Sequence, residues 1–152
     1  ISKVDHERFS LKCKPKKNDI LLGKAASVGK VALVDLDLDF NIWSPLAVIR
    51  VSQNKMSPQF TYFLMKSDFL QTQISLKVNW NTQGNIGMGD IKNLFILQPP
   101  YDEEKQIENF LDKKTTQFDD LISKSQSQVN FLQEKRQALI TSAVTGKIDV
   151  RK

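Results

Sequence analysis

The chain is poor in the residues that build disulfide frameworks and metal sites. Its 152 residues include one cysteine, Cys13, and one histidine, His6. A single cysteine excludes an internal disulfide and is typical of a reducing compartment, so we expect a cytoplasmic protein. Because His6 has no cysteine or histidine companion nearby in the sequence, we expect it at the surface and predict no zinc site. No metal ion or other cofactor is expected.

Long apolar runs are lacking as well. No run approaches the roughly 18 apolar residues of a membrane-spanning helix, and the N-terminus has no secretory hydrophobic stretch. The sequence therefore predicts no contact with a membrane. Because 40% of the residues are hydrophobic and 9% aromatic, the chain can still build a core. Since it begins at Ile1, we expect it to be part of a longer protein.

Positive charge is concentrated in the first two thirds of the chain. Residues 1–100 contain 13 lysines and arginines against 8 acidic residues, whereas residues 101–152 contain 9 of each. The net charge of +5 therefore belongs to the first part. A basic globular part followed by a neutral segment is typical of a polyanion-binding head on a spacer. An ordinary basic surface is the alternative.

One long stretch contains neither proline nor glycine. It runs from Tyr101 to about Ala143, follows Pro99-Pro100 and is closed by Gly146. Asp102 is a candidate N-cap, and Gly146 is a candidate left-handed residue beyond the C-terminus. The stretch predicts one helix on the order of 60 Å long. A helix of that length needs a partner to cover its apolar stripe, which makes it an assembly or spacing element.

Two columns of residues at intervals of seven follow this predicted helix. They fit the a and d positions of a heptad pattern, interrupted by Thr115, Ser125 and Arg136. The apolar members of these columns predicted to pair with another helix are Leu111, Phe118, Ile122, Val129, Leu132 and Leu139.

Residues 20–34 predict a β-hairpin with a basic tip. Residues 20–22 and 31–34 are short apolar strands, and a glycine-bounded loop, residues 23–30, joins them. The loop is not a phosphate-binding P-loop, because Gly23 and Gly29 are one residue too far apart and Val31 stands where a serine or threonine is needed. Lys24, Ser27 and Lys30 are its candidate DNA-binding residues.

The other segments predict a small mixed domain. Residues 46–51 predict a buried strand, residues 60–74 a helix entered at Pro58, and residues 91–97 a closing strand. Residues 35–40 alternate acidic with apolar side chains, as a half-exposed strand or turn would. The fold class is α+β, with a small mixed α/β domain followed by a long C-terminal helix that forms a coiled coil.

Residues 77–90 are too polar and too rich in glycine for a core. Asparagine and glutamine amides can read adenine edges, and lysine can reach guanine, so this is the best candidate for direct base contact. An ordinary asparagine-rich turn is the alternative. The candidate DNA-binding residues here are Lys77, Asn79, Trp80, Asn81, Gln83 and Asn85.

The N-terminal segment, residues 1–19, is polar and basic. Lys14, Lys16 and Lys17 surround Pro15 and are candidates for contact with a phosphate backbone. A solvated loop before the first strand is the alternative interpretation.

No catalytic constellation is found. Gln98-Pro99-Pro100-Tyr101 is close to a motif of amino-methyltransferases, but Gln98 departs from its Asp or Asn, and entry into a helix explains the prolines better. The sequence has no nucleophile with a paired base, no metal cluster and no cofactor loop. We expect a protein that is not itself an enzyme.

Taken together, the chain resembles the specificity subunits of type I restriction–modification systems. The matching stretches are DILLGKAASVGKVALV at 19–34, GDIKNL at 89–94, the prolines at 99–100 with EKQI at 104–107, and KRQALITSAVTGKIDV at 135–150. The last two stretches are the most specific, and the resemblance covers nearly the whole chain.

The resemblance implies different roles for the two parts of the chain. Such subunits typically carry two target recognition domains, each followed by a long helix, and the helices pair antiparallel and set the spacing of two half-sites. It implies that residues 1–98 are a target recognition domain and residues 99–152 a helical spacer and assembly region. It further implies a non-catalytic component that directs methyltransferase and endonuclease subunits to a bipartite DNA site.

The chain departs from this pattern in three ways. It holds one recognition domain and one helix, so it resembles half a subunit. The part of the domain upstream of residues 19–21 is expected to be mostly missing, and Lys105 stands inside a signature more usually Glu-Glu-Gln-Ile. The implied partners are double-stranded DNA, methyltransferase subunits, a restriction subunit through the complex, and a second copy or half subunit through the helix. The alternative is a helix-mediated assembly or adaptor protein that binds no DNA.

Overall fold

A computed structural model describes residues 2–52, 54–80 and 83–151. The chain divides into two compact units, Ile1–Asn109 and Phe110–Lys152. The functional boundary between residues 98 and 99, which separates a target recognition domain from a helical assembly region, stays a prediction. None of the helices in the described part of the chain is both long and apolar enough to cross a bilayer.

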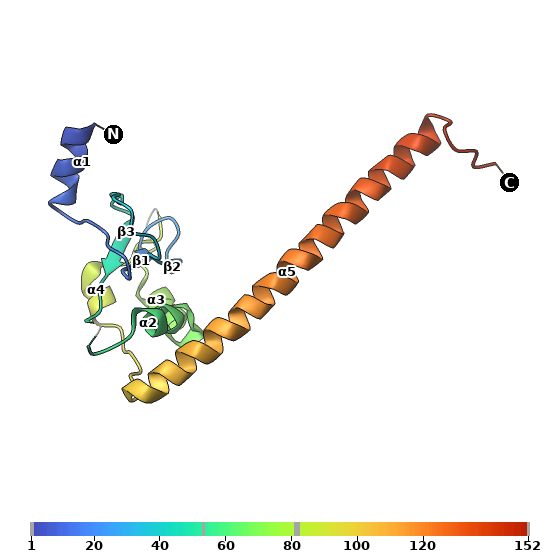
Figure 1. The fold of residues 1–152 in the computed structure, drawn as a ribbon. Helices are drawn as coiled ribbons and strands as arrows, with labels where there is room; N and C mark the ends of the chain where they lie inside the picture. The colour runs from blue at the N-terminus through green and yellow to red at the C-terminus, as the bar shows by residue number, and fades with distance from the viewer. Residues whose placement is uncertain (1, 53, 81–82, 152) are drawn as a thin grey trace. The chain divides into compact units, whose positions relative to one another are not determined.

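A three-stranded antiparallel sheet lies at the centre of the first unit (Figure 1). The central strand pairs with both neighbours, so Leu21 lies opposite Ala32 on one side and Val48 on the other. The predicted hairpin is confirmed, and the strand predicted at 46–51 is present but shorter. In spatial order the strands are β2 (Val31–Leu33), β1 (Ile20–Gly23) and β3 (Leu46–Ile49).

Short helices complete this unit, and α2 packs against both β2 and α3. Serine hydroxyls cap them: the side chain of Ser57 accepts from the N–H of Phe60 at the start of α2, and that of Ser67 from Leu70 at the start of α3. The core lies between the sheet and α2 and α3, and includes Leu22, Ala47, Phe60, Leu64, Leu70, Ile74 and Ile86. The helices are α1 (Lys3–Ser10), α2 (Pro58–Lys66), α3 (Asp68–Lys77) and α4 (Met88–Lys92).

Two local predictions and one alternative interpretation were wrong. The N-terminal segment is not all loop, because residues 3–10 form α1, capped by the side chain of Ser2. The helix predicted over 60–74 is two helices, because Ser67 adopts an extended conformation between them. The strand predicted at 91–97 is absent, since α4 ends at Lys92 and residues 93–100 have no regular structure.

The long helix is confirmed as α5 (Tyr101–Val144), 44 residues without a break. At about 1.5 Å per residue it is about 66 Å long. Its start differs from the prediction: the N–H of Glu104 already donates to the carbonyl of Pro100, so Asp102 lies inside the first turn and is not the N-cap. Its end agrees, because Gly146 has φ +71° and its N–H donates to the carbonyl of Ala143.

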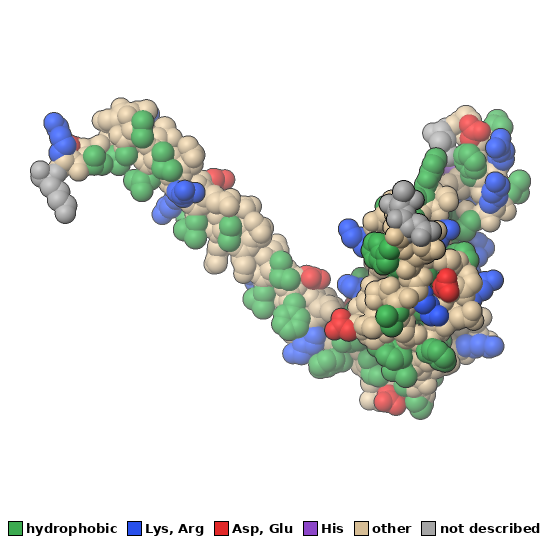
Figure 2. Space-filling view, turned by 180° about the vertical axis from the view of Figure 1, so that it is seen from behind, with side chains coloured by type: hydrophobic (Ala, Val, Ile, Leu, Met, Phe, Trp, Pro, Cys, Tyr) green, Lys and Arg blue, Asp and Glu red, His purple; other side chains and the backbone are tan. Residues whose placement is uncertain are grey.

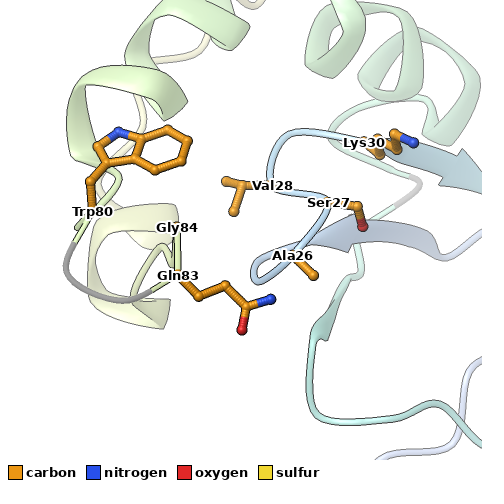
Figure 3. Close-up of a pocket in the computed structure, with 7 residues that line it drawn as sticks. All are labelled: Ala26, Ser27, Val28, Lys30, Trp80, Gln83 and Gly84. Carbon is orange, nitrogen blue, oxygen red and sulfur yellow. The ribbon is translucent and has the colours of Figure 1, made fainter.

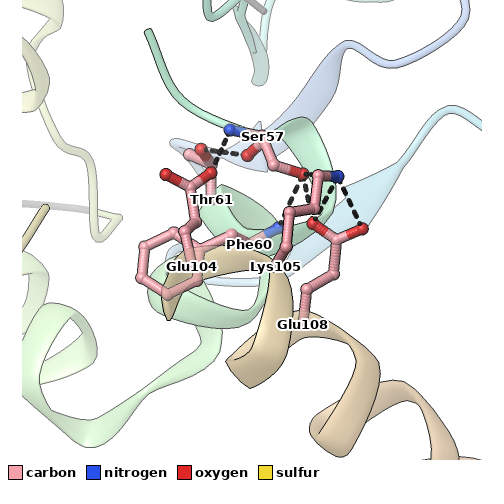
Figure 4. A network of polar contacts seen from close by, with 6 residues as sticks. All are labelled: Ser57, Phe60, Thr61, Glu104, Lys105 and Glu108. Carbon is pink, nitrogen blue, oxygen red and sulfur yellow. Dashed lines mark hydrogen bonds and ion pairs between the residues drawn. The ribbon is translucent and has the colours of Figure 1, made fainter. Parts of the chain in front are cut away.

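The first two turns of α5 belong to the first unit and are held to α2 by a polar network (Figure 4). Glu104 is 0% exposed and accepts a hydrogen bond from the N–H of Ser57. The Ser57 hydroxyl donates to Glu108, and Lys105 lies 3.1 Å from the same carboxylate. The second oxygen of Glu104 has no hydrogen-bond partner among the described residues. Ile107 packs against the core beside this network, so both polar and apolar contacts fix the start of α5.

Candidate nucleic-acid interface

The loop between β1 and β2, residues 23–30, folds tightly upon itself. The N–H of Gly29 donates to the carbonyl of Gly23, and the N–H of Gly23 donates to the carbonyl of Lys30. Gly29 has φ +84°, a conformation that residues with a side chain rarely adopt. From outside the loop, the side-chain amide of Gln71 donates to the Gly29 carbonyl at 2.9 Å. These bonds hold the loop in one shape at the end of the hairpin.

A second loop, residues 78–87 between α3 and α4, is bonded to the first. Its arms join through a bridge in which Asn79 and Asn85 exchange backbone hydrogen bonds of 2.8 and 3.1 Å. Asn85 also bridges to Ala25, and the N–H of Ile86 donates to the carbonyl of Lys24. Two loops that are separated by 47 residues in the sequence therefore form one continuous surface.

Between the two loops lies an open hollow of about 560 Å³ (Figure 3). The ring of Trp80 and the side chain of Val28 point toward one another across it. Trp80 is 72% exposed, so its indole face is available to a ligand. Among the described residues none that lines the hollow is acidic, and those that line it are Ala26, Ser27, Val28, Lys30, Trp80, Gln83 and Gly84.

Gly84 sets the position of Trp80. A Cβ at residue 84 would lie 2.7 Å from the Cζ3 atom of the indole, which is closer than atoms can approach. The six-membered ring of the indole therefore lies close to Gly84 in its own loop. In this position the exposed ring lines one side of the hollow.

The structure thus brings part of the predicted set together. Ser27 and Lys30 from the first loop meet Trp80 and Gln83 from the second. Lys24 stands beside them in the first loop, and its carbonyl is bonded to the second loop. Asn79 and Asn85 form the base of the second loop and leave their side chains exposed, and Lys77 is the last residue of α3 beneath it. Asn81 lies outside the described residues.

The three N-terminal candidates are not brought to this surface. Lys14, Lys16 and Lys17 precede β1, whereas the loop follows it, and the four residues of the strand rise by about 10 Å. The Nζ of Lys14 lies 2.8 Å from the carboxylate of Asp39. The hydrogen bond from Lys14 is the main reason why the pKa of Asp39 lies below its usual value. Part of the positive charge of this segment is therefore already balanced.

Beside these lysines, an ion pair with a buried carboxylate fixes the start of β1. Asp19 is 1% exposed and accepts hydrogen bonds from the Nε and Nη2 atoms of Arg50 at 2.7 and 2.6 Å and from the N–H of Lys16 at 2.7 Å. Burial raises the pKa of Asp19, but the hydrogen bonds and charge of Arg50 together with the Lys16 N–H outweigh it, so the pKa is lowered.

Two features of this region were not predicted. Gln71 lies within a predicted helix, and nothing in the sequence indicates that its amide reaches Gly29. A second, mostly apolar hollow of about 530 Å³ lies on the other side of the first loop, where Lys24 and Trp43 are among its lining residues. The available signal for this hollow was Trp43 in a predicted bend. The sequence alone does not show whether its side chain is exposed or buried.

The six residues predicted to pair with another helix are distributed along α5. Within the single chain Phe118, Ile122, Val129, Leu132 and Leu139 are exposed and Leu111 is half-buried. Figure 2 shows apolar side chains along the length of this helix. Their role in pairing stays a prediction.

Comparison with known proteins places the chain in a family. A model of the type I restriction modification DNA specificity domain matches residues 2–130. The specificity subunit of the type I restriction enzyme EcoBI from Escherichia coli is 22% identical over 135 residues, which is 89% of this chain and 28% of that protein.

Solved structures give the same result. The S subunit of a type I restriction-modification system from M. genitalium is 25% identical, with a TM-score of 0.56 over 71% of this chain and 28% of that one. The HsdS subunit from Thermoanaerobacter tengcongensis resembles the fold with a TM-score of 0.60 at 23% identity, again over 71% and 28% of the two chains. The chain therefore spans little more than a quarter of the length of these relatives. The family match covers most of its residues, and the chain belongs to the type I restriction modification DNA specificity domain family.

Proposed function

We propose that this chain recognises DNA sequence for a type I restriction–modification complex and catalyses no reaction itself. The observation that carries the proposal is the surface formed by residues 23–30 and 78–87. That surface combines an exposed indole, an amide, a hydroxyl and a lysine around a hollow whose described lining residues include no acidic one. Amides and lysines that reach base edges distinguish base pairs, while basic residues hold phosphates.

In this proposal the two ends of the first unit have different tasks. The residues of the two loops, among them Ser27, Lys30, Trp80 and Gln83, contact base edges and adjacent phosphates. The N-terminal lysines contact phosphates only and carry no sequence information. The start of α5, fixed to α2 through Glu104, connects the recognition surface to the rest of α5, which we call the assembly helix.

In this proposal the assembly helix binds the protein partners. Its exposed apolar side chains are proposed to pair with a second helix and to contact the methyltransferase subunits, with a restriction subunit joining through the complex. If two copies of this chain pair, the assembly has two recognition surfaces related by symmetry. Such an assembly recognises two half-sites in inverted orientation.

Selection from a random pool of duplex oligonucleotides tests this proposal. The purified chain is expected to enrich a defined motif, and Gln83→Ala is expected to relax specificity at one or more positions of it. Each bidentate base contact contributes about 1–3 kcal/mol of discrimination. The same expectation holds for Asn81→Ala. Unchanged specificity in every variant of the second loop refutes the assignment of that loop.

Lysine variants provide the matched comparison. Lys14→Ala and Lys17→Ala are expected to weaken binding to all duplexes equally and to reduce the slope of log affinity against log salt by about 1. Fluorescence anisotropy at several salt concentrations measures both quantities. A change of motif in these variants contradicts their proposed role.

The exposed apolar residues of α5 also favour a second candidate function. A pure assembly protein would use this helix and would bind no DNA. It predicts no salt-dependent affinity for duplex DNA, and loss of a protein partner when Leu111, Phe118, Leu132 or Leu139 is replaced. The same anisotropy titration therefore separates the two functions.

A further inference from the structure

β3 is an edge strand of the sheet, and its outer side pairs with no other strand of the described chain (Figure 1). Successive residues of an antiparallel strand direct their backbone groups alternately to one side and to the other. The N–H of Lys24 donates to the carbonyl of Pro45, directly before β3. Every second residue after Pro45, Ala47 and then Ile49, therefore faces β1. Val48 directs its N–H and its carbonyl outward, and no described residue bonds to either group.

The mostly apolar hollow of about 530 Å³ follows this free edge. Leu46, Ala47 and Val48 all line it. Since consecutive side chains of a strand point to opposite faces, a hollow that touches three in a row runs along the edge of the sheet. Phe9 and Met88 line the hollow too and are 39% and 43% exposed. The unpaired backbone groups of Val48 thus lie beside an accessible apolar surface.

Trp43 adds an aromatic side chain where the chain enters β3. It lines the hollow and is 79% exposed. Its carbonyl accepts a hydrogen bond of 2.9 Å from the N–H of Leu46, so a turn holds its backbone beside the strand. Exposed aromatic side chains at an apolar surface are typical of sites that bind other proteins.

Two lysines, Lys12 and Lys24, are the charged side chains among the described residues that line the hollow. They belong to opposite ends of β3. Lys24 is bonded through its N–H to Pro45, directly before the strand. Lys12 lies two residues before Lys14, whose carbonyl accepts a hydrogen bond from Arg50, directly after the strand. An apolar hollow with a lysine towards each end is complementary to a segment that carries apolar side chains and carboxylates.

We propose that the outer edge of β3 binds an extended segment of a partner protein as a fourth strand of the sheet. The segment alternates apolar and acidic side chains. Its backbone pairs with Val48, and its apolar side chains fill the hollow beside Trp43. Its carboxylates lie close to Lys12 and Lys24. Strand addition of this kind gains affinity from main-chain hydrogen bonds and specificity from side-chain pockets. The inference does not rest on DNA recognition.

The chain itself contains a sequence of this kind, which serves as the probe. Residues 35–40, DLDLDF, alternate acidic and apolar side chains and have no regular secondary structure. Leu36 and Leu38 are 57% and 60% exposed. A fluorescein-labelled peptide DLDLDF is expected to bind the full chain, as measured by fluorescence anisotropy.

A peptide of the same composition, DDDLLF, is the control for attraction by charge alone. It cannot place its apolar side chains on one side of a strand, so we expect it to bind at least about tenfold more weakly. Equal affinity of the two peptides overturns strand addition.

Methylation of peptide nitrogens tests the main-chain pairing. In an added strand, alternate N–H groups face β3 and the others face away. One DLDLDF peptide is methylated at the second, fourth and sixth nitrogens, and another at the third and fifth. We expect one of them to bind within about threefold of the unmethylated peptide and the other to lose binding, because only one set of N–H groups is bonded. Equal losses with both peptides overturn the pairing.

Val48→Pro tests the same pairing from the side of the protein. Proline is tolerated in an edge strand where its nitrogen faces solvent, and the N–H of Val48 points away from the sheet. We expect the variant to fold, as circular dichroism will show, and to raise the dissociation constant of DLDLDF by about tenfold or more. Val48→Thr keeps the N–H and is the matched control. If Val48→Pro does not fold, the methylated peptides decide the question with the unaltered chain.

Charge reversal tests the complementarity. Lys12→Glu is expected to raise the dissociation constant of DLDLDF by about fivefold or more, because a carboxylate replaces the cation beside the bound segment. Lys66→Glu is the control, since Lys66 lies in α2, which packs against β2 at the other edge of the sheet. It is expected to change the constant by less than about twofold. Equal effects of the two variants overturn the role of Lys12.

Further outcomes separate this inference from the proposed function. Val48→Pro is expected to keep the DNA affinity of the wild type. An equal loss of DNA and peptide affinity assigns the edge of β3 to the DNA surface and overturns the protein partner. A chain that self-associates, and whose association DLDLDF reverses, has residues 35–40 of a second copy on this edge, which also overturns a separate partner.

Discussion

At the scale of single residues, hydrogen-bond partners decide which side chains have a structural role. Asp19 is buried with three donors around it, whereas Asp149 at the other end of the chain forms an exposed ion pair with Arg151. In the sequence both are single aspartates near basic residues. The sequence contains no signal for the Asp19–Arg50 pair, because 31 residues separate its members and only the sheet brings them together.

The Asp19–Arg50 pair predicts a specific pH dependence of stability. Because the pKa of Asp19 is lowered from 3.8, its stabilising contribution is present above that value and is lost as the pH falls through the pKa of the folded state. Asp19→Asn is expected to lower the free energy of unfolding by about 1–2 kcal/mol at neutral pH, a modest value because Arg50 is half exposed. Urea unfolding at several pH values is expected to show this difference shrinking below about pH 4.

Asp149→Asn is the control, since its pair is exposed and its removal is expected to change nothing measurable. If the difference in the free energy of unfolding between Asp19→Asn and the wild type stays constant down to strongly acidic pH, the buried carboxylate of Asp19 is not ionised in the folded protein.

The contact between Gly84 and Trp80 predicts a change of function without a loss of stability. Gly84→Ala pushes the indole away from its loop, and the ring can move because it is exposed. We expect DNA affinity to fall by about fivefold to tenfold, since stacking or edge contacts of one aromatic ring contribute about 1–3 kcal/mol. Trp80 fluorescence in a Trp43→Phe background reports the displacement, and anisotropy reports the affinity.

Gly89→Ala is the matched control, because a Cβ at residue 89 meets no atom within 4 Å. Equal DNA affinity of the Gly84 and Gly89 variants would show that the position of the indole has no part in binding.

At the scale of elements, the sequence predicted what local chemistry determines and failed where tertiary contacts decide. The hairpin at 20–34 and the helix from residue 101 were predicted correctly because their periodicity and end signals are local. The strand at 91–97 was wrong because its apolar residues have no neighbouring strand. Instead, the side-chain amide of Gln73 satisfies the N–H and carbonyl of Phe95 at 2.9 and 3.0 Å.

The break between α2 and α3 could have been predicted. Ser67 followed by Asp68 is an N-cap signal with acidic charge in the first turn, but the apolar spacing continued across it. The candidate site was predicted only in part for a different reason. The residue types of loop 77–90 predicted DNA contact. The attachment of this loop to residues 23–30 is made by backbone hydrogen bonds, which amino-acid composition does not predict.

The attachment of α5 to α2 predicts a strong effect of one buried carboxylate. Glu104→Ala removes the acceptor of the Ser57 N–H and leaves a cavity, so the free energy of unfolding of the first unit is expected to fall by about 2–3 kcal/mol. Urea denaturation monitored by tryptophan fluorescence measures it. Glu103→Ala, one residue earlier and exposed, is expected to have no comparable effect. Equal stabilities of the two variants would contradict the role of Glu104.

At the scale of the whole molecule, the family could be identified from the sequence while the specificity could not. The stretch at 19–34, a β-hairpin, lies within residues 2–130, the part of the chain that the family model matches, whereas the stretch at 135–150, at the end of α5, lies beyond it. The loops that carry the proposed recognition do not have that regularity. Which bases they contact depends on where a few side chains, such as Trp80 and Gln83, meet the DNA.

We propose that this chain supplies the sequence specificity of a DNA-modifying complex. A genome-wide map of methylated adenines in cells that make the cognate modification subunit, with and without this chain, tests it most directly. We expect a new interrupted motif that appears only with the chain, and a symmetric motif if two copies pair through α5. A map that stays unchanged, although the chain and the modification subunit co-purify, would contradict this role and leave an assembly protein without a recognition function.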